Sequence, residues 1–589
     1  MTTGIALPEV AAGGVIRQRT ARDWIADRPG LLVALAYLAA ALALNWRLWA
    51  GLGTMAPVGD PGPADNDLMA WFMRYAANAV AHGHLPALVT TALNAPHGIN
   101  LMWNVSMLFP AVALAPVTLL GGPLASLTTL ATLGYAGSAA AMYWLLRRHG
   151  ASVPAAGLGG AVFGFSPGMV NAGTAHYAIE FAVLTPLLAE AVLSLLIGRG
   201  RPLLTGAWLG LLATAQLFTG EEMLSNVAIG CLVLAAVLGA SCRPAARARL
   251  SGTARGLAAA VIALAVCWHA MWIQFHGPLT QHGSPWPIAK FANGFGAFVD
   301  PPAGVVVHSA SSVAYADAHG ASSAEYVAYL GPLLLVLVAG ATVWYWDVVR
   351  VRVAGVTWAA LEALSLGVNG PLPFHWLQYL PLFGDMIPSR MSILADAAAA
   401  AVLAFWLDLA RSGTPGTAGP LRRAAPAVIA LLAVLPLVPR PVAAVPAAQV
   451  PAGWDRVFTQ LHLAPDSSVL VVPVPYSQQG EAMLWQADSG QPGKLVAGWF
   501  LGPGPSGRAG ASYWGPSYTT RAVFCLDALW QDKDPGPGCA RNLGLALRYW
   551  HPAAVVADTG PGTPLVRFLI GLLGAPATRD GQLLGWRIR

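Results

Sequence analysis

Three aspartates follow the first long apolar segment of a chain in which only 10% of residues are charged. They are Asp60, Asp65 and Asp67, in the sequence GDPGPADND. Carboxylates just outside an apolar segment can act as general bases, bind a metal ion or belong to an ordinary hydrated loop. Asp60 stands between Gly59 and Pro61, so we expect a turn that holds it partly desolvated, where a carboxylate becomes a better base. The alternative is that Asp60 only stabilises the turn and that Asp65 caps the following helix.

The stretch that follows these acids predicts an amphipathic helix from residue 67 to 81. Its aromatic residues Trp71, Phe72 and Tyr75 are of the kind found at the headgroup level of a membrane, which favours a helix lying along the interface. Arg74 either snorkels toward water or contacts a lipid phosphate.

Further polar residues follow or interrupt apolar stretches and could bind a substrate. Their side chains pair with sugar hydroxyls, phosphates or metal ions, although loop stabilisation or interface anchoring would explain them as well. They are His97 in APHGINLMWN, then His176, Tyr177 and Glu180 in AHYAIE, Glu221 and Glu222 in FTGEEML, and Arg390 in IPSRM.

Composition identifies the class of protein that must position these residues. Of the 589 residues 56% are hydrophobic, which indicates a polytopic membrane protein of mostly α-helical structure. The net charge of +6 does not indicate a nucleic-acid partner, because the basic residues form short clusters between apolar runs.

About eleven segments are apolar enough to cross a membrane, and the arginine clusters between them fall in every second loop. This alternation places residues 1–30 in the cytoplasm as a tail and predicts a transmembrane domain over residues 31–441. We interpret 105–120 as an interfacial helix, because counting it as a span would put Arg147 and Arg148 outside. The expected spans are 31–51, 123–146, 152–168, 180–198, 203–219, 223–241, 256–275, 329–346, 353–369, 391–410 and 424–441.

The external parts in this topology are a first loop over 52–122, a large loop over 276–328 and a C-terminal domain over 442–589. The runs VLVVPVP and AAVVAD in the last region are typical of buried strands, so we expect a small extracytoplasmic α/β domain. Cys525 and Cys539 lie there and could form a disulfide.

This pattern resembles the GT-C superfamily of integral membrane glycosyltransferases. The matching features are Asp60 after the first span, interfacial helices near 67–83 and 105–120, and the polar stretch from His176 to Glu180. EYVAYLGPLLL, IPSRM and the C-terminal domain are similar to bacterial YfhO-like and related members. The family's second aspartate has no evident counterpart, since His176 and Glu180 stand near that place, so a divalent metal stays possible.

The resemblance implies inverting transfer of a sugar from a polyprenyl-phosphate carrier, at the outer face of the cell membrane, to a glycan, lipid or protein acceptor of the envelope. Asp60 would be the general base, and Arg390, with Arg74, would bind the carrier phosphate. The other polar residues named above would shape the cavity. Two rival interpretations remain. One is a flippase of lipid-linked intermediates, in which the dispersed Glu190, Glu362 and Asp396 would form a proton path. The other is a non-catalytic assembly protein.

Overall fold

The computed structural model describes residues 29–588, apart from 60–61, 320–321, 371–377, 380–383, 385, 414–418, 465 and 513. Most of the predicted cytoplasmic tail and Asp60 itself therefore lie outside the described residues.

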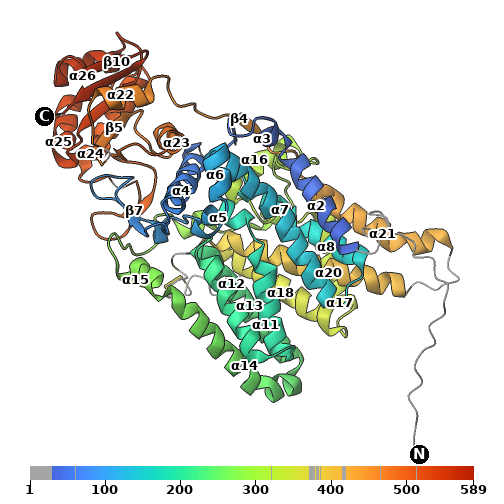
Figure 1. Cartoon of the computed structure of the whole chain (residues 1–589). Helices are drawn as coiled ribbons and strands as arrows, with labels where there is room; N and C mark the ends of the chain where they lie inside the picture. The colour runs from blue at the N-terminus through green and yellow to red at the C-terminus, as the bar shows by residue number, and fades with distance from the viewer. Residues whose placement is uncertain are drawn as a thin grey trace, which may run out of the picture.

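A bundle of helices forms most of the molecule, and a smaller α/β domain stands at one end of it (Figure 1). A helix occupies each of the eleven segments predicted to cross the membrane. The bundle helices are α2 (Pro29–Leu44), α3 (Trp46–Ala50), α7 (Pro123–Arg148), α8 (Val153–Gly164), α11 (Leu184–Ile197), α12 (Pro202–Leu217), α13 (Glu221–Ser241), α14 (Arg243–Leu264), α15 (Trp268–His276), α17 (Pro332–Trp344), α18 (Val349–Ser365), α20 (Met391–Ser412) and α21 (Pro420–Val434).

Five helical segments among the described residues are long and apolar enough to span a membrane: Val153–Ala172, Glu221–Ser241, Arg249–His276, Pro388–Ser412 and Pro420–Leu437. The count of about eleven spans stays a prediction. Residues 105–120 form two short helices, α5 (Leu108–Ala113) and α6 (Ala115–Gly121). Neither approaches the length of about 20 residues that a crossing needs.

Local sequence explains where two of the helices between α7 and α11 start. Ser152 and Ser166 each precede a helix, α8 and the short α9 (Pro167–Ala172), and accept a hydrogen bond from a backbone N–H of its first turn. A proline lies in the first turn of both helices, where its missing N–H costs nothing. The single turn α10 (Tyr177–Glu180) follows and brings His176 and Tyr177 to the end of the bundle.

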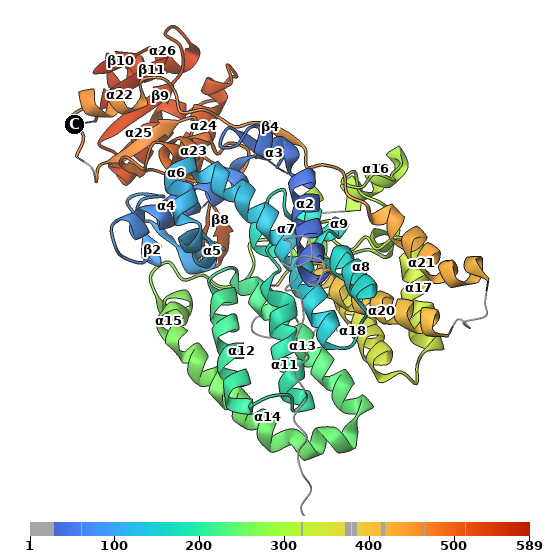
Figure 2. The ribbon, with the colours of Figure 1, turned by 45° about the vertical axis from the view of Figure 1, so that its right-hand side comes forward.

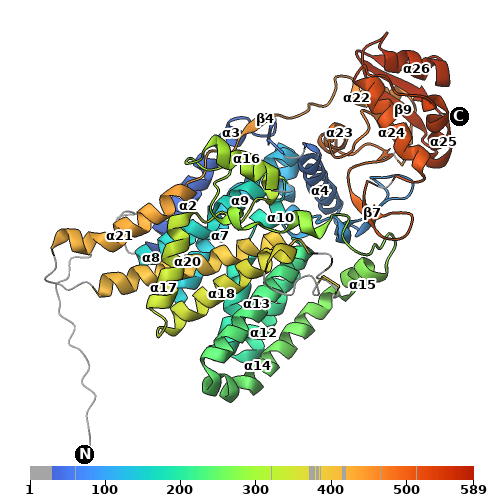
Figure 3. The same cartoon turned by 180° about the vertical axis from the view of Figure 1, so that it is seen from behind.

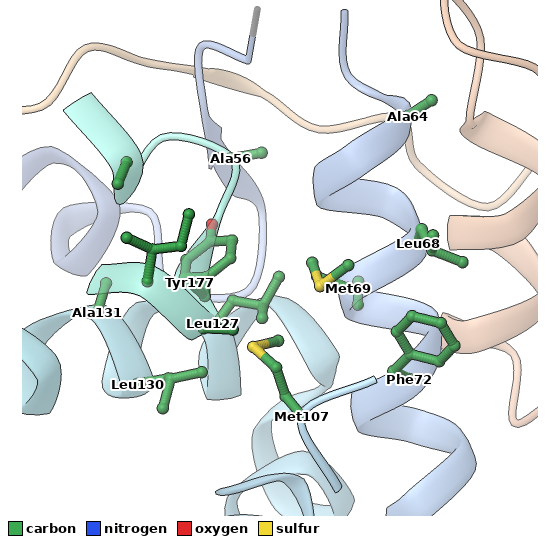
Figure 4. Packing of buried hydrophobic residues seen from close by; sticks show 14 of the residues in the cluster. Ala56, Ala64, Leu68, Met69, Phe72, Met107, Leu127, Leu130, Ala131 and Tyr177 are labelled. Atoms are coloured by element: carbon green, nitrogen blue, oxygen red, sulfur yellow. The ribbon is translucent and has the colours of Figure 1, made fainter. Parts of the chain in front are cut away.

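Helix α4 (Ala64–Ala81) differs from the interfacial helix that its sequence predicts. Trp71 and Phe72 are fully buried, and the core formed by α4, α7 and Tyr177 covers one side of the helix (Figure 4). The C-terminal domain covers another side, so these aromatics do not lie against lipid. The helix starts at Ala64 behind Pro63, so Asp65 lies inside its first turn rather than capping it.

The C-terminal domain is built on a five-stranded mixed sheet in the order β10-β11-β9-β5-β6. Strands β5 (Ser468–Val472) and β9 (Ala554–Asp558) lie in the two apolar runs noted in the sequence and pair in parallel, Leu470 opposite Val555. The remaining elements are β6 (Lys494–Leu495), β10 (Thr578–Asp580), β11 (Leu583–Arg587), α22 (Trp454–Gln460), α23 (Glu481–Asp488), α24 (Ser517–Trp530), α25 (Cys539–Trp550), α26 (Pro564–Leu573) and the hairpin β7 (Leu501–Pro503) with β8 (Ala509–Ala511).

Residues 52–122, which the sequence predicts as the first external loop, bind the C-terminal domain through their backbone. Strand β1 (Met55–Pro57) pairs with β4 (Ala444–Pro446), and the N–H groups of Asn94 and Ala95 donate to the carbonyls of Ala497 and Leu495. Figures 2 and 3 show the domain beside α4 in both views. Hydrogen bonds between segments some 400 residues apart therefore fix the domain at this end of the bundle.

Cys525 and Cys539 form a disulfide that joins the start of α25 to α24. Its closed loop spans 14 positions of sequence, for which the entropy of the unfolded chain predicts a stabilisation of about 3 kcal/mol. We expect Cys525→Ser to make the C-terminal domain unfold and become protease-sensitive at a lower temperature, and Cys242→Ser, which removes a free thiol, to have no such effect. Equal protease resistance of both variants would contradict a stabilising role.

Candidate active site

One cavity of about 720 Å³ lies where the first external loop, the ends of α13 and α20 and the C-terminal domain meet. The large loop 276–328 closes another side, with Trp286, Lys290 and Glu325. Residues from six separate parts of the sequence, including the segment 175–179, thus line a single space. Its polar lining includes Asp65, Asn104, His176, Tyr177, Glu222, Lys290, Glu325, Arg390 and Tyr476.

Arg390 holds two carboxylates at the wall of this cavity. Its Nε donates to Glu325 Oε2 at 3.1 Å, its Nη2 donates to the other oxygen of Glu325, and its Nη1 donates to Glu222. Glu222 also accepts a hydrogen bond from the backbone N–H of Ile387 at 3.2 Å. The two-point contact with Glu325 fixes the plane of the guanidinium, so Arg390 is a rigid part of the wall.

His176 adds a second basic group to this cluster. Its Nδ1 lies 3.6 Å from Glu325 Oε1, which is close enough for an electrostatic contact and too long for a good hydrogen bond. Burial by itself would raise the pKa of Glu325, but Arg390 and then His176 outweigh burial and hold that pKa below its usual range. Glu325 is therefore a carboxylate rather than a carboxylic acid at neutral pH.

The C-terminal domain orients Asp65, another lining residue of this cavity. Trp499 Nε1 donates a hydrogen bond to Asp65 Oδ1 at 2.6 Å. Nearby, Asn104 Oδ1 accepts from the backbone N–H of Leu501 in β7 at 2.7 Å, and Asn104 Nδ2 donates to the Leu501 carbonyl at 2.8 Å. Trp286 faces Trp499 with ring centroids 6.4 Å apart. A carboxylate beside two tryptophans is an arrangement that suits a sugar, which has both hydroxyls and an apolar face.

Two sequence-predicted residues of the first loop lie at the domain contact instead of the cavity. Arg74 Nε donates to the carbonyl of Ala487 at 2.7 Å, and the ring of His97 packs on Tyr549 at 4.9 Å between centroids. Both side chains bind the C-terminal domain, so their positions do not support contacts with a carrier phosphate or a sugar.

Three predicted acids also do not line the cavity. Asp67 lies against Gly480 of the C-terminal domain, and Glu180 is buried against α7, where a Cβ on Gly134 would collide with its carboxyl group. Glu221 starts α13 beside Glu222 but is not among the lining residues. Of the predicted residues that the structure describes, the cavity brings together Asp65, His176, Tyr177, Glu222 and Arg390.

Sequence reasoning missed Glu325, Lys290 and the tryptophans as site residues. Lys290 carried a usable signal, because the chain has only three lysines, Lys290, Lys494 and Lys533. Glu325 lies in a stretch noted only for its family resemblance. Its place beside Arg390 depends on a contact across 65 positions of sequence, which no local pattern reveals.

No group of three or more His, Cys, Asp or Glu side chains is placed to hold a metal ion within the described ranges. Of the acids that line the cavity, Glu222 and Glu325 are paired with Arg390, and Asp65 accepts a hydrogen bond from Trp499.

Asp67 offers a test of the contact between α4 and the C-terminal domain. Burial, and then repulsion from Glu481, raise the pKa of Asp67 well above its usual value. The folded protein therefore retains a proton that the unfolded chain releases above about pH 4, so the free energy of unfolding falls as pH rises beyond that value.

We expect Asp67→Asn to remove this cost and to raise the apparent melting temperature at pH 7, because a gain in the free energy of unfolding shifts the midpoint upward. The gain should shrink toward pH 4, where both states bind the proton. Thermal unfolding in detergent over this pH range measures it, and Asp455→Asn, which changes an exposed carboxylate of α22, is the control. A lower melting temperature for Asp67→Asn at pH 7 would contradict the inferred cost.

Comparisons with known proteins bear on the fold. A scan of protein families and a search of curated proteins give no match. Among solved structures, the arabinofuranosyltransferase AftD from Mycobacteria is similar with a TM-score of 0.53 and 17% identity, over 97% of this chain and 40% of that one. The Archaeoglobus fulgidus oligosaccharyltransferase in the apo form is similar with a TM-score of 0.50 and 12% identity, over 91% and 70%. The chain thus spans less than half the length of the first of these proteins.

Proposed function

We propose, on the basis of the GT-C glycosyltransferase fold that this chain has, that it is an inverting glycosyltransferase. It would move a sugar from a polyprenyl-phosphate carrier to an acceptor of the cell envelope. The finer similarity to YfhO-like members stays a prediction. The observation that carries the proposal is the cavity of about 720 Å³, in which acids, cations and tryptophans from distant parts of the chain surround one space.

The reaction requires a base for the acceptor, and we assign this role to Asp60. Described residues that follow it in the sequence support this assignment: Gly62 packs against Ser477, a lining residue, and a Cβ on Gly62 would come within 2.7 Å of the Ser477 carbonyl oxygen. Asp65, a few positions later, lines the same cavity. Removing the proton from an acceptor hydroxyl lets its oxygen attack the anomeric carbon from the face opposite the phosphate, while the bond from that carbon to the phosphate oxygen breaks.

The leaving polyprenyl phosphate gains a negative charge, so a cation near it would stabilise the transition state. Arg390, assigned to this role from the sequence, is already paired with Glu222 and Glu325. Lys290 lines the cavity, is exposed and forms no ion pair with any described carboxylate. We therefore assign the phosphate contact to Lys290 and a positioning role to Arg390.

The topology belongs to this proposal. Arginine clusters at one end of the bundle favour a cytoplasmic N-terminus, which puts the cavity and the C-terminal domain on the outer face of the cell membrane. The Cys525–Cys539 disulfide supports this orientation, because such bonds persist in oxidising compartments.

The flippase interpretation loses part of its support. Glu190 pairs with Arg148, His149 and Arg199, which is a structural ion cluster rather than an open proton site. Incubating reconstituted protein with a radiolabelled pool of polyprenyl-phosphate sugars separates the alternatives. Transfer of label to an envelope acceptor supports the enzyme. Translocation without transfer, or neither process, would contradict it in favour of a flippase or an assembly protein.

A further inference from the structure

A second cavity of about 510 Å³ lies inside the helical bundle and is almost wholly apolar. Helices α13 and α20 line it together with residues of α7, α11 and α18. The lining residues of α13 are Val227, Gly230, Cys231, Leu234 and Leu238, and those of α20 are Leu394, Ala397, Ala398, Ala401 and Phe405. In each set the later residues stand three, four, seven and eleven positions after the first, so each set forms one continuous face of its helix.

Protein side chains do not fill the space between these two faces. The buried residues of α13 are Met223, Asn226 and Val227, all in its first two turns, and the rest of this helix is only partly covered. The alanines of α20 are too small to reach across. An apolar space of this size within a membrane domain suits an apolar chain, because hydrocarbon can occupy it without losing any hydrogen bond.

The length of the cavity fits one membrane leaflet. From Val227 to Leu238 there are eleven steps along α13, or about 16 Å at 1.5 Å for each residue. This is close to half of the hydrocarbon core of about 30 Å.

Charge is found at only one end of this cavity. Arg350 lies there with its guanidinium carbon 5.0 Å from the centre of the Phe405 ring and next to Gly150. It forms no ion pair with any carboxylate of the described residues. His149 lines the same end but is bound to Glu190 at 2.6 Å. Asp408 is the acid of α20 closest in sequence to Phe405. Its carboxylate accepts hydrogen bonds from the backbone N–H and the hydroxyl of Ser152 and does not pair with Arg350.

The opposite end, at Val227 and Leu394, is apolar and lies about one turn from Glu222 and Arg390 of the candidate active site. An occupant with its phosphate at Arg350 therefore points its chain toward the active site from the other side of the membrane. A carrier with its phosphate in the active-site cavity would have the reverse orientation.

From these features we propose that the cavity binds an anionic phospholipid of the leaflet that faces the basic end of the bundle. One acyl chain lies between α13 and α20, and the phosphate contacts Arg350. The proposal does not rest on glycosyl transfer, since it concerns a separate cavity with its own charge and its own side of the membrane.

Native mass spectrometry of delipidated protein, titrated with dioleoylphosphatidylglycerol, tests the proposal. A cation near the membrane surface contributes about 1 kcal/mol to the binding of an anionic lipid, which is about fivefold in affinity. Arg350→Ala should therefore weaken binding about fivefold. Arg352→Ala is the matched control, because Arg352 lies on the same helix but donates to the Trp346 carbonyl and does not line the cavity.

A second variant tests the chain-binding part. Ala401→Phe fills the cavity and should abolish the tightly bound lipid, whereas Leu232→Phe, on the exposed side of α13, should not. If Ala401→Phe does not fold, the smaller change Ala401→Leu tests whether filling the cavity weakens lipid binding, and Arg350→Ala still tests the phosphate contact. Three outcomes would overturn the proposal: equal effects of the two arginine variants, equal binding of dioleoylphosphatidylcholine, or displacement of phosphatidylglycerol by polyprenyl phosphate with no dependence on Arg350.

Discussion

Asp60→Asn is expected to lower the rate of sugar transfer by about 100- to 10,000-fold, the usual contribution of a general base. Asparagine keeps the size of the side chain, but it cannot take the proton of the acceptor hydroxyl. Because this proton moves in the transition state, kcat should fall while donor binding stays close to that of the wild type. Single-turnover transfer from a radiolabelled polyprenyl-phosphate sugar measures the chemical step separately from binding.

The matched control is Asp317→Asn, which removes an exposed carboxylate of α16 (Ala310–His319), in the predicted external loop 276–328 but not in the lining of the cavity. Its transfer rate should equal that of the wild type. If folded, membrane-inserted Asp60→Asn protein transferred sugar at the wild-type rate, the assignment of the base would be wrong.

Arg390→Leu is expected to be strongly destabilising and inactive. It removes the cation that three hydrogen bonds tie to Glu222 and Glu325 and leaves both carboxylates at a largely buried site. Removing one partner of a buried ion pair typically costs about 3–5 kcal/mol, because the remaining charge loses its compensation. The amount of folded protein after detergent extraction and its thermal unfolding measure this loss.

Neutralising the carboxylates should separate stability from function. In the triple variant Arg390→Leu, Glu222→Gln, Glu325→Gln no uncompensated charge remains, so we expect most of the stability to return while transfer stays lost. Wild-type stability of Arg390→Leu alone would show that the cluster does not depend on this guanidinium. Full activity of the triple variant would contradict a positioning role.

The helical architecture could be predicted from the sequence because its signal is local. Apolar runs bounded by arginines predicted segments at the places where α7, α11, α13 and α20 lie, since each run records the hydrocarbon surroundings of its own residues. The same argument separated 105–120 from the spans, and the structure resolves that stretch into two short helices.

The surroundings of α4 could not be predicted in this way. Its amphipathic pattern is the same whether lipid or protein covers the apolar face, and only the fold shows that the C-terminal domain covers it. Trp71 Nε1 donates to Gln486 Oε1 at 2.6 Å, across 415 positions of sequence. The sequence therefore leaves two interpretations of Arg74, snorkelling toward water or a phosphate contact, whereas in the structure its Nε donates to the Ala487 carbonyl of this domain.

The candidate site could be predicted in part, because some of its residues carry a local signal in the sequence. His176, Glu222 and Arg390 stand out as polar residues near the ends of apolar segments, and the cavity gathers them. Glu325 and Lys290 belong to a long loop whose path depends on contacts with α20 and the C-terminal domain. A sequence pattern can predict which residues lie at a membrane surface, but it does not predict which of them contact one another in the fold.

The central claim is that the sugar of a polyprenyl-phosphate donor binds in the cavity between the first external loop, α13, α20 and the C-terminal domain. Photolabelling with a donor that carries a diazirine on its sugar, followed by peptide mapping, tests this claim most directly. The account predicts adducts in peptides that contain Trp286 to Lys290 and Trp499 to Leu501, reduced by unlabelled donor. Labelling confined to the apolar cavity beside α13, or label that unlabelled donor does not reduce, would contradict it.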